Sequence, residues 1–361
     1  MESMRRVLLA VLGALLLVLP LPGVHVAPAH AVGATAIASG LDFPAAMTVA
    51  PGGLIFYGER FTGEIRTRNR NTGADRSFFT ISSIATDGEQ GLLGLAVHPL
   101  YPSTPFVYAY ATRIVGGVAQ NHVIRITAAN GVGTGMSVLL DLRAGGNHNG
   151  GAMVFGPERR LFIVTGEIGN PANSQITTNL VGKVLRIDGG GGPAPGNVLG
   201  NRVFSYGHRN MFGAAIDPQR GLVWVTENGP GCNDEINRPV NGGNFAWGPS
   251  QFCGVPPDAE DTNRDGPSPR RFPASLINPV IAPTGAVFCA GCGLGSATEG
   301  TLLFGAWNDG SIRRLTLNGT RTGVTASTLL YDHPSGVLAM ARAPDGDILF
   351  TDSDQIFQLT P

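Results

Sequence analysis

The amino-acid sequence predicts an all-β protein with the architecture of a six-bladed β-propeller. One observation is composition, because 52 glycines and 26 prolines among 361 residues favour many turns between short strands. Another is a repeated pattern of apolar strand, Pro/Gly/Asp turn and second apolar strand. A third is the lack of long helical periodicity, since Pro and Gly interrupt every window that could hold a helix.

The repeated pattern occurs six times, at intervals of roughly 50 to 65 residues. In each copy the first strand is almost continuously apolar, which is typical of a strand buried on both faces. Regular spacing of antiparallel units favours a propeller over a sandwich. The copies read AAMTVAPGGLIFYGE, GLLGLAVHPLYPSTPFVYAYAT, GAMVFGPERRLFIVTGE, GAAIDPQRGLVWVTEN, PTGAVF with GTLLFGAWNDGSIRRLTL, and VLAMARAPDGDILFTDSDQIFQLT.

The two ends of the repeat region fit a closed ring. The segment ATAIASGL near residue 35 and the segment QIFQLT near residue 357 are both strand-like, and we expect them to share one blade. Residues 32–361 are therefore predicted to form one domain. The Pro-rich segment 254–279 is predicted to be a long insertion between two blades.

The first 31 residues have the layout of a secretory signal peptide. Arg5 and Arg6 precede an apolar run at 7–21, and small residues surround the expected cleavage after Ala31. We therefore expect an exported protein, in an extracellular or periplasm-like compartment. No later run reaches the about 18 apolar residues of a membrane span.

Charge excludes two classes of partner. The formal net charge is −1 and charged residues make up only 14% of the chain, so there is no basic field for nucleic acid and no polybasic patch for a membrane. The sequence leaves the oligomeric state open.

Export makes disulfides the expected state of the four cysteines. Four cysteines allow three pairings. Cys289 and Cys292 form a CxxC pair, but one such pair without a second pair or a histidine is a weak zinc signal. We favour the two local bonds, Cys232–Cys253 and Cys289–Cys292.

Polar loops precede several of the copies, and His148 in GGNHNGG is the most distinctive residue among them. Glycines let the backbone approach other groups closely, so a polar side chain here can face an opening. The simpler interpretation is a tight turn with a surface histidine. Loops at equivalent places in a propeller converge on one mouth of its channel, and that convergence favours a site.

The other polar loops supply further candidates. Arginine beside asparagine suits carboxylates and carbonyl oxygens, although an ion pair between blades is the alternative. Adjacent acidic residues could bind calcium or cap a turn. These candidates are Glu89 and Gln90, Arg209 and Asn210, and Asp234 and Glu235.

A second possible calcium loop begins with the sequence DTNRDG. Asp261, Asn263 and Asp265 have the spacing with which an EF-hand loop opens. The twelfth position is Phe272 instead of glutamate. A modified calcium loop and a plain turn rich in Asp and Asn are equally compatible with this pattern.

Several motifs together resemble the glucose/sorbosone dehydrogenase family, over nearly the whole mature chain. They are DGEQGLLGLAVHP, NHNGGAMVFGP, GKVLRID, SYGHRNMFG, ENGP…NDEIN and GGNFAWGP, in the family's order. The resemblance implies a six-bladed propeller that carries pyrroloquinoline quinone (PQQ) and calcium at its channel. It also implies oxidation of the anomeric carbon of aldose sugars to lactones, with an external electron acceptor.

The resemblance also implies roles for individual residues. His148 matches the catalytic base, and Asn147 stands where the family often has an aspartate. The remaining matches are Arg209 and Asn210 as the pair that contacts the quinone, Glu89 or Gln90 as a polar cofactor contact, Gly229 and Pro230 as carbonyl ligands of calcium, and Asp234 and Glu235 as the adjoining acidic motif.

The chain departs from the family pattern at its cationic positions. The family has a lysine that pairs with a cofactor carboxylate, and the matching position in this chain is about that of Asn308. The only lysine of the chain, Lys183, lies in GKVLRID. The last copy also lacks the arginines that precede its turn in the family. Burying carboxylates without cationic partners is costly.

Two alternatives to the dehydrogenase follow from these residues. One is a propeller of the same family that has lost PQQ and binds a ligand or a protein partner. The other is a calcium-dependent hydrolase or lactonase, although the chain has no GxSxG elbow. The glycine run GGGGPAPG near residue 190 is not followed by a helix pattern, so nucleotide binding is unsupported.

Overall fold

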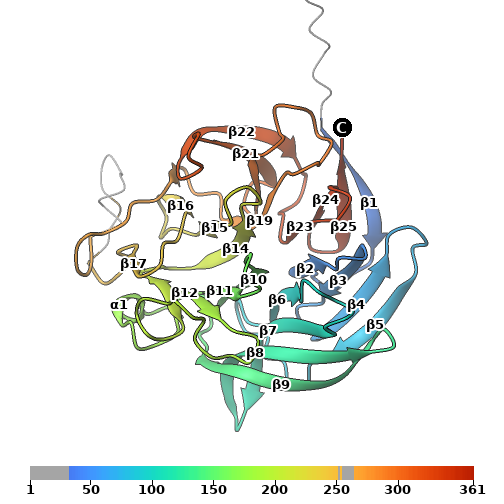
Figure 1. The fold of residues 1–361 in the computed structure, drawn as a ribbon, viewed down its shortest axis with the longest axis horizontal. Coiled ribbons are helices and arrows are strands. Elements are labelled where there is room, and N and C mark those ends of the chain that lie inside the picture. Colours follow the sequence, from blue (N-terminus) through green and yellow to red (C-terminus); the bar gives the residue numbers. More distant parts are fainter. Residues whose placement is uncertain (1–31, 251–252, 254–263) are drawn as a thin grey trace, which may run out of the picture. The chain divides into compact units, whose positions relative to one another are not determined.

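A computed structural model describes residues 32–250, 253 and 264–361, which form six sheets around a common centre (Figure 1). All named strand pairs are antiparallel except β13 with β17, which are parallel. The predicted six-bladed propeller is confirmed, and each sequence copy supplies the first two strands of one blade. The predicted signal peptide, residues 1–31, lies outside the described residues.

The blades are numbered one to six along the chain. From the innermost strand outwards, blade one contains β2 (Ala46–Val49), β3 (Leu54–Gly58), β4 (Glu64–Asn69) and β5 (Asp75–Thr80), and blade two contains β6 (Leu92–Val97), β7 (Phe106–Val115), β8 (Val118–Ala129) and β9 (Val132–Arg143). Blade three contains β10 (Gly150–Phe155), β11 (Leu161–Thr165), β12 (Lys183–Ile187), β13 (Val203–Tyr206) and β17 (Gly243–Asn244), and blade four contains β14 (Met211–Ile216), β15 (Val223–Glu227), β16 (Asp234–Asn237) and β18 (Ser275–Ile277). Blade five contains β19 (Pro283–Phe288), β20 (Leu302–Ala306), β21 (Ser311–Leu317) and β22 (Val324–Asp332), and blade six contains β23 (Met340–Arg342), β24 (Ile348–Thr351), β25 (Gln355–Thr360) and β1 (Gly33–Ser39).

The ring closes as the sequence predicts. Strand β1 pairs antiparallel with β25, from Gly33 opposite Thr360 to Ser39 opposite Gln355, so both ends of the domain share blade six (Figure 1). Each innermost strand also contacts the next, and β23 contacts β2. Backbone pairing therefore joins the two ends of the domain within blade six.

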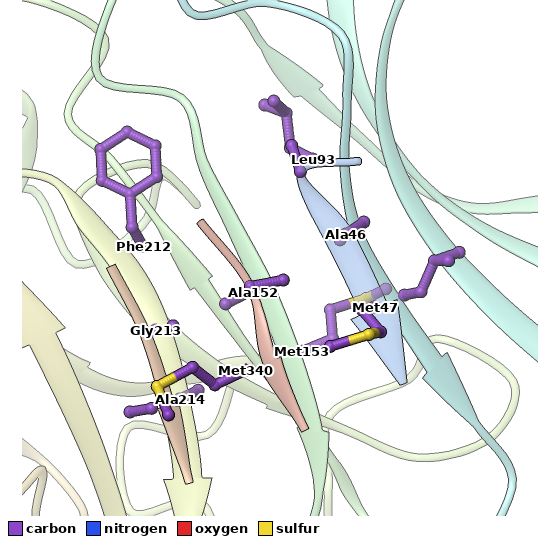
Figure 2. Close-up of a pocket in the computed structure, with 15 residues that line it drawn as sticks. Ala46, Met47, Leu93, Ala152, Met153, Phe212, Gly213, Ala214 and Met340 are labelled. Carbon is purple, nitrogen blue, oxygen red and sulfur yellow. The ribbon is translucent and has the colours of Figure 1, made fainter. Parts of the chain in front are cut away.

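The innermost strands surround a narrow channel. Figure 2 shows its lining of small and apolar side chains, among them Ala46, Ala152 and Met340, around a cavity of about 60 Å³. The hydrophobic core lies between neighbouring blades, where for example Phe56 of blade one and Leu95 of blade two belong to the same buried cluster. Packing between sheets leaves the loops at the channel ends free to carry polar groups.

Both favoured disulfides, Cys232–Cys253 and Cys289–Cys292, are present. In the predicted insertion 254–279, residues 254–263 lie outside the described residues. Its later part contributes β18, which pairs with β16 as the outer strand of blade four. The one helix of the described residues is α1 (Ala172–Gln175), and within that part of the chain no helix has the length and apolarity needed to cross a membrane.

Candidate active site

His148 lies directly before β10 and forms a pair with a buried carboxylate. Its Nδ1 is 2.7 Å from Oε1 of Glu167, which follows β11 and is 1% exposed. No other described residue forms a hydrogen bond with the His148 ring. Because a carboxylate only accepts, the neutral imidazole carries its proton on Nδ1, and Nε2 keeps a free lone pair.

The GGNHNGG loop is held in a strained conformation. His148 has a φ of 55°, in the left-handed region that non-glycine residues seldom adopt. The buried Asn149 closes the loop, since its side chain accepts from the Gly145 N–H at 3.1 Å and donates to the Gly145 carbonyl at 2.9 Å. Gln90 donates to the same carbonyl at 2.9 Å. These bonds fix the direction of the imidazole.

Glu89 ties this loop to the next blade. Its Oε2 accepts the His148 backbone N–H at 2.7 Å and the Asn210 Nδ2 at 3.1 Å. Its own backbone N–H donates to the Gly146 carbonyl at 2.8 Å. The preceding Gly88 is required there, because a Cβ at Gly88 would lie 2.0 Å from the Gly146 oxygen.

Arg209 and Asn210 precede β14 beside the same carboxylates. The Arg209 guanidinium donates to the Asn228 carbonyl at 2.9 Å and lies over the Trp247 ring at 5.4 Å. Burial lowers the pKa of Arg209, and the surrounding carboxylates, led by Glu167, oppose that shift. The guanidinium is thus a partly buried cation among acidic groups.

A second histidine–carboxylate pair lies in the same place of blade four. His208 Nδ1 is 2.8 Å from Glu227 Oε2, and within each of the two pairs the histidine and the glutamate are 19 residues apart in sequence. Here Nε2 also has a partner, Ser205 Oγ at 2.8 Å, and the His208 side chain is fully buried. Glu227 further accepts from the Arg209 backbone N–H and from Asn237 Nδ2. This pair is therefore closed on itself.

The acidic motif lies next to Arg209. Asp234 accepts backbone N–H groups from Gly229, Ile281 and Ala282, at 2.8, 2.6 and 2.9 Å. Burial raises the pKa of Asp234, and these three hydrogen bonds oppose the shift. The Asp234 carboxylate thus already braces two loops.

The other residues predicted to bind calcium surround a very small cavity. Gly229, Pro230 and Glu235 line about 10 Å³ together with Arg209 and Trp247. Carbonyl and carboxylate oxygens are the ligands that calcium prefers. Within the described residues, the only group of three metal-ligating side chains is Cys289, Cys292 and Glu299, and both of its sulfurs belong to a disulfide.

A larger cavity of about 290 Å³ opens at this end of the channel, and we call it the mouth pocket. Ala45, Leu93 and Phe212 line both the mouth pocket and the channel. Glu89 and Asn228 connect it with the groups described above. Its lining is Phe43, Ala45, Arg60, Glu89, Leu93, Phe212, Asn228, Ala282, Thr284, Trp307 and Leu338.

The structure brings part of the predicted set together. Hydrogen bonds join His148, Glu89 and Asn210. Arg209 lies in the same loop as Asn210, directly before it. Asn147 is exposed, and its side chain forms no hydrogen bond with the described residues. Asp265 accepts the Ser250 N–H at 2.7 Å, in a different loop. Asp261 and Asn263 lie outside the described residues.

Sequence reasoning missed Glu167, Asn228 and Arg60. Glu167 is the last residue of VTGE and Glu227 the third of VTEN, at nearly equivalent places, so comparison of the copies could have found Glu167. Asn228 lies within the ENGP motif, and its backbone N–H donates to the Asn210 carbonyl at 2.8 Å. Arg60 follows β3 in a loop with no distinctive sequence pattern.

Fold and site together define a six-bladed propeller with a histidine–carboxylate pair, an arginine and amides near one mouth of its channel. The chain belongs to the glucose/sorbosone dehydrogenase family, whose model matches residues 41–359. The family expected from the motifs is thereby confirmed.

Individual relatives agree with this family. Quinoprotein glucose dehydrogenase B of Acinetobacter calcoaceticus is 31% identical over 58% of this chain, a match that spans only 51% of that protein's length. Aldose sugar dehydrogenase YliI of Escherichia coli K12 is 28% identical over 57% of this chain and 59% of its own. The PQQ-bound structure of an aldose sugar dehydrogenase from Streptomyces coelicolor has a TM-score of 0.78 at 27% identity, over 92% of this chain and 98% of that one.

Proposed function

We propose that this protein is an exported, PQQ- and calcium-dependent dehydrogenase that oxidises the anomeric carbon of aldose sugars to lactones. His148 is its general base. The observation that carries this proposal is the His148–Glu167 pair, whose Nε2 has no partner among the described residues. Family membership supports the reaction class.

The proton step follows from the geometry of the pair. Glu167 keeps the proton on Nδ1, so Nε2 can take the proton of the sugar's C1 hydroxyl. The nearby Glu167 carboxylate then stabilises the imidazolium that forms, as the buried acid does in a serine protease triad. Glu89 holds the His148 backbone and so fixes where Nε2 points.

The residues present fit a quinone cofactor at the mouth. Arg209 and Asn210 offer a cation and an amide. The buried acceptors Glu167 Oε2 and Asn210 Oδ1 have no hydrogen-bond partner among the described residues, so an N–H or O–H of a bound ligand can satisfy them. Bound PQQ supplies the electrophilic carbon that takes the C1 hydride. The charge of Arg209 favours the electron-rich oxygens of a quinone. The electrons taken from the sugar would pass to an external acceptor.

The other predicted cofactor contacts take different places in this proposal. Glu89 lines the mouth pocket and can contact the cofactor directly. Gln90 is buried and acts through the Gly145 carbonyl, so we assign it to positioning. Asn147 is exposed and is assigned to the solvent side of the site.

Calcium is proposed at the small cavity beside Arg209. The carbonyl groups of Gly229 and Pro230 and the Glu235 carboxylate are the proposed ligands, and Asp234 adds negative charge. A second calcium site is proposed at Asp261, Asn263 and Asp265. The ion at the first site would draw electron density from the quinone.

Export is proposed from the signal peptide, with cleavage after Ala31. Both disulfides are consistent with an oxidising compartment. The alternative of a propeller without PQQ is not favoured, because the base, its carboxylate and the Arg209–Asn210 pair all lie at one mouth.

The test is reconstitution of the purified protein with PQQ and calcium, followed by dye reduction with a panel of aldoses. We expect activity, and a loss of at least about 10³-fold in kcat for His148→Ala, because the base is removed. His98→Gln is the matched control, since His98 follows the opposite end of β6 from Glu89 and Gln90. No activity with any aldose and no bound cofactor would reject the dehydrogenase.

A further inference from the structure

We propose that Arg60 is the cation that pairs with a carboxylate of the cofactor in the mouth pocket, and that Phe43 and Trp307 form the apolar wall against its ring. This inference rests on the proposed function, because it takes PQQ as the occupant. It assigns cofactor contacts to three residues for which the sequence motifs predict no role.

Arg60 is placed in the mouth pocket by aromatic rings. Its guanidinium carbon lies 5.1 Å from the Phe43 ring centre and 4.7 Å from that of Phe61. The Arg60 backbone N–H donates to the Phe43 carbonyl at 3.1 Å. Phe43 itself has a φ of 53°, and an aromatic residue held in the left-handed region is strained. Such strain is frequent at ligand sites, and here it places the ring in the pocket wall.

Two hydrogen bonds orient the guanidinium without using all its donors. Nε donates to the Gln90 carbonyl at 2.9 Å, and one terminal nitrogen donates to the Gly88 carbonyl. An arginine has five N–H donors, so three are left for a ligand. Burial lowers the pKa of Arg60 and the Glu89 charge opposes that shift, so the group is partly desolvated next to one carboxylate. Desolvation strengthens an interaction with a second anion.

The charges around the mouth pocket leave Arg60 as its cation. Among the described lining residues it is the only basic one, and Glu89 is the only acidic one. Arg209 lies near Glu89 as well, but it lines the small cavity. A ligand with three carboxylates needs positive charge along its edge. Arg60 is positioned to supply it.

Three other arginines lie close in sequence to the positions where the family has its cationic residues, and all three point elsewhere. Arg342 donates to the Ala290 carbonyl at 2.9 Å and lines a cavity together with Val49 and Pro218, beyond the far ends of the inner strands. Arg313 lies near Asp309 and Ser311, and Arg314 donates to Thr328 and Thr298. None of these three lines the mouth pocket.

The wall of the pocket beside Arg60 is aromatic and apolar. The ring centres of Phe43 and Trp307 are 5.7 Å apart, and Trp307 remains 40% exposed. An exposed indole that lines a cavity offers a large apolar face to a ligand. Ala45, Leu93 and Phe212 continue this surface towards the channel. A planar aromatic ligand with a carboxylate edge matches this apolar surface together with the Arg60 guanidinium.

The contacts of Arg60 with Gly88 and Gln90 could also serve only to hold the loop that carries Glu89. A pair of probes separates these roles, because the trimethyl ester of PQQ keeps the ring and lacks the carboxylate charges. A loop defect weakens the binding of PQQ and of its ester equally. Loss of a partner for the carboxylates weakens only the binding of PQQ.

The experiment measures equilibrium binding of PQQ and of its trimethyl ester, with calcium, by quenching of tryptophan fluorescence. We expect Arg60→Ala to weaken PQQ binding about 10- to 100-fold and the ester less than about threefold, with Arg60→Lys in between. Rising salt should weaken PQQ binding to the wild type more than to Arg60→Ala. Arg76→Ala, an exposed arginine on the outer strand β5, is the matched control and should bind both probes like the wild type.

Trp307→Phe reports the place of binding. Trp224 and Trp247 do not line the mouth pocket, and Trp247 lies over Arg209, so the variant should lose the Trp307 share of the quenching and keep that of Trp247, while dialysis still shows bound PQQ. Unchanged PQQ affinity in Arg60→Ala, or equal weakening of both probes, overturns the inference. If the wild type binds no PQQ at all, the proposed function fails, which is a different result.

Discussion

Blades three and four carry the same histidine–carboxylate arrangement, and they differ at one atom. In both, Nδ1 faces a buried glutamate 19 residues further along the chain, at 2.7 Å for His148 and 2.8 Å for His208. Ser205 occupies Nε2 of His208, whereas Nε2 of His148 has no partner among the described residues. The His148 side chain is 13% exposed and that of His208 is 0%.

The difference separates a structural pair from the pair that contains the proposed base. His208 and Glu227 are saturated by Ser205, Asn237 and the Arg209 backbone, so they hold blade four together. A third pair, His333 and Asp352, is again 19 residues apart and buried, but there the carboxylate bonds Nε2 of the histidine, at 3.1 Å. In blades three and four the blade geometry places the pair through Nδ1, and the partner at Nε2 is what distinguishes them.

The largest expected effect comes from neutralising the carboxylate of the His148–Glu167 pair, which we call the open pair because Nε2 has no partner among the described residues. Glu167→Gln should lower kcat by about 10²–10⁴-fold, because the amide no longer fixes the proton on Nδ1 or stabilises the imidazolium. Stopped-flow or dye-reduction kinetics measure the effect, and circular dichroism checks the fold. A kcat within threefold of the wild type would mean that His148 does not depend on Glu167.

The same substitution in the closed pair should act on stability instead. Glu227→Gln exchanges one acceptor oxygen for an N–H₂ group facing His208, Asn237 or the Arg209 N–H, which should lower the free energy of unfolding by about 3 kcal/mol. Urea denaturation at neutral pH measures it. An unchanged midpoint would remove the structural role assigned to this pair.

A smaller effect is expected at Lys183, which connects both pairs. Its Nζ donates to the carbonyls of Asn173 and Ser174, at 2.8 and 3.0 Å. Asn173 in turn donates to the Glu167 carbonyl, and Ser174 to the His208 carbonyl. Lys183→Met removes these contacts and should cost about 2 kcal/mol of stability at pH 7.

This cost should depend on pH. Burial lowers the pKa of Lys183 to about 7 from an ordinary value of 10.5. Between these values the unfolded chain binds the proton and the folded protein does not, so the wild type gains up to about 1.4 kcal/mol per pH unit as pH rises. The difference between wild type and Lys183→Met should therefore widen from pH 7 to pH 9. A constant difference would show that Lys183 keeps its charge when folded.

The fold was predictable because its repeat is written in apolar strands and turns. The pairing of β1 with β25 followed from two strand-like ends, whereas the two-residue strand β17 has no such pattern. Short strands depend on tertiary contacts, which a local pattern does not contain.

The site was predictable only in part. The loops around His148 and Arg209 stand out by composition, but the sequence could not show which asparagine beside His148 faces inward. Asn149 is buried and Asn147 is exposed, and the left-handed turn at His148 decides between them. Arg60 was missed because its loop meets the other site loops only in the folded ring, whereas the likeness of the copies around Glu167 and Glu227 could have indicated Glu167.

The most direct test of the central claim is a double-mutant cycle on His148 and Glu167. We measure kcat for His148→Ala, Glu167→Ala and the double variant, each reconstituted with PQQ and calcium. If the two residues act as one unit, the double variant should be no slower than His148→Ala alone. Losses that multiply in the double variant would show that Glu167 acts independently of the histidine, and would contradict the account.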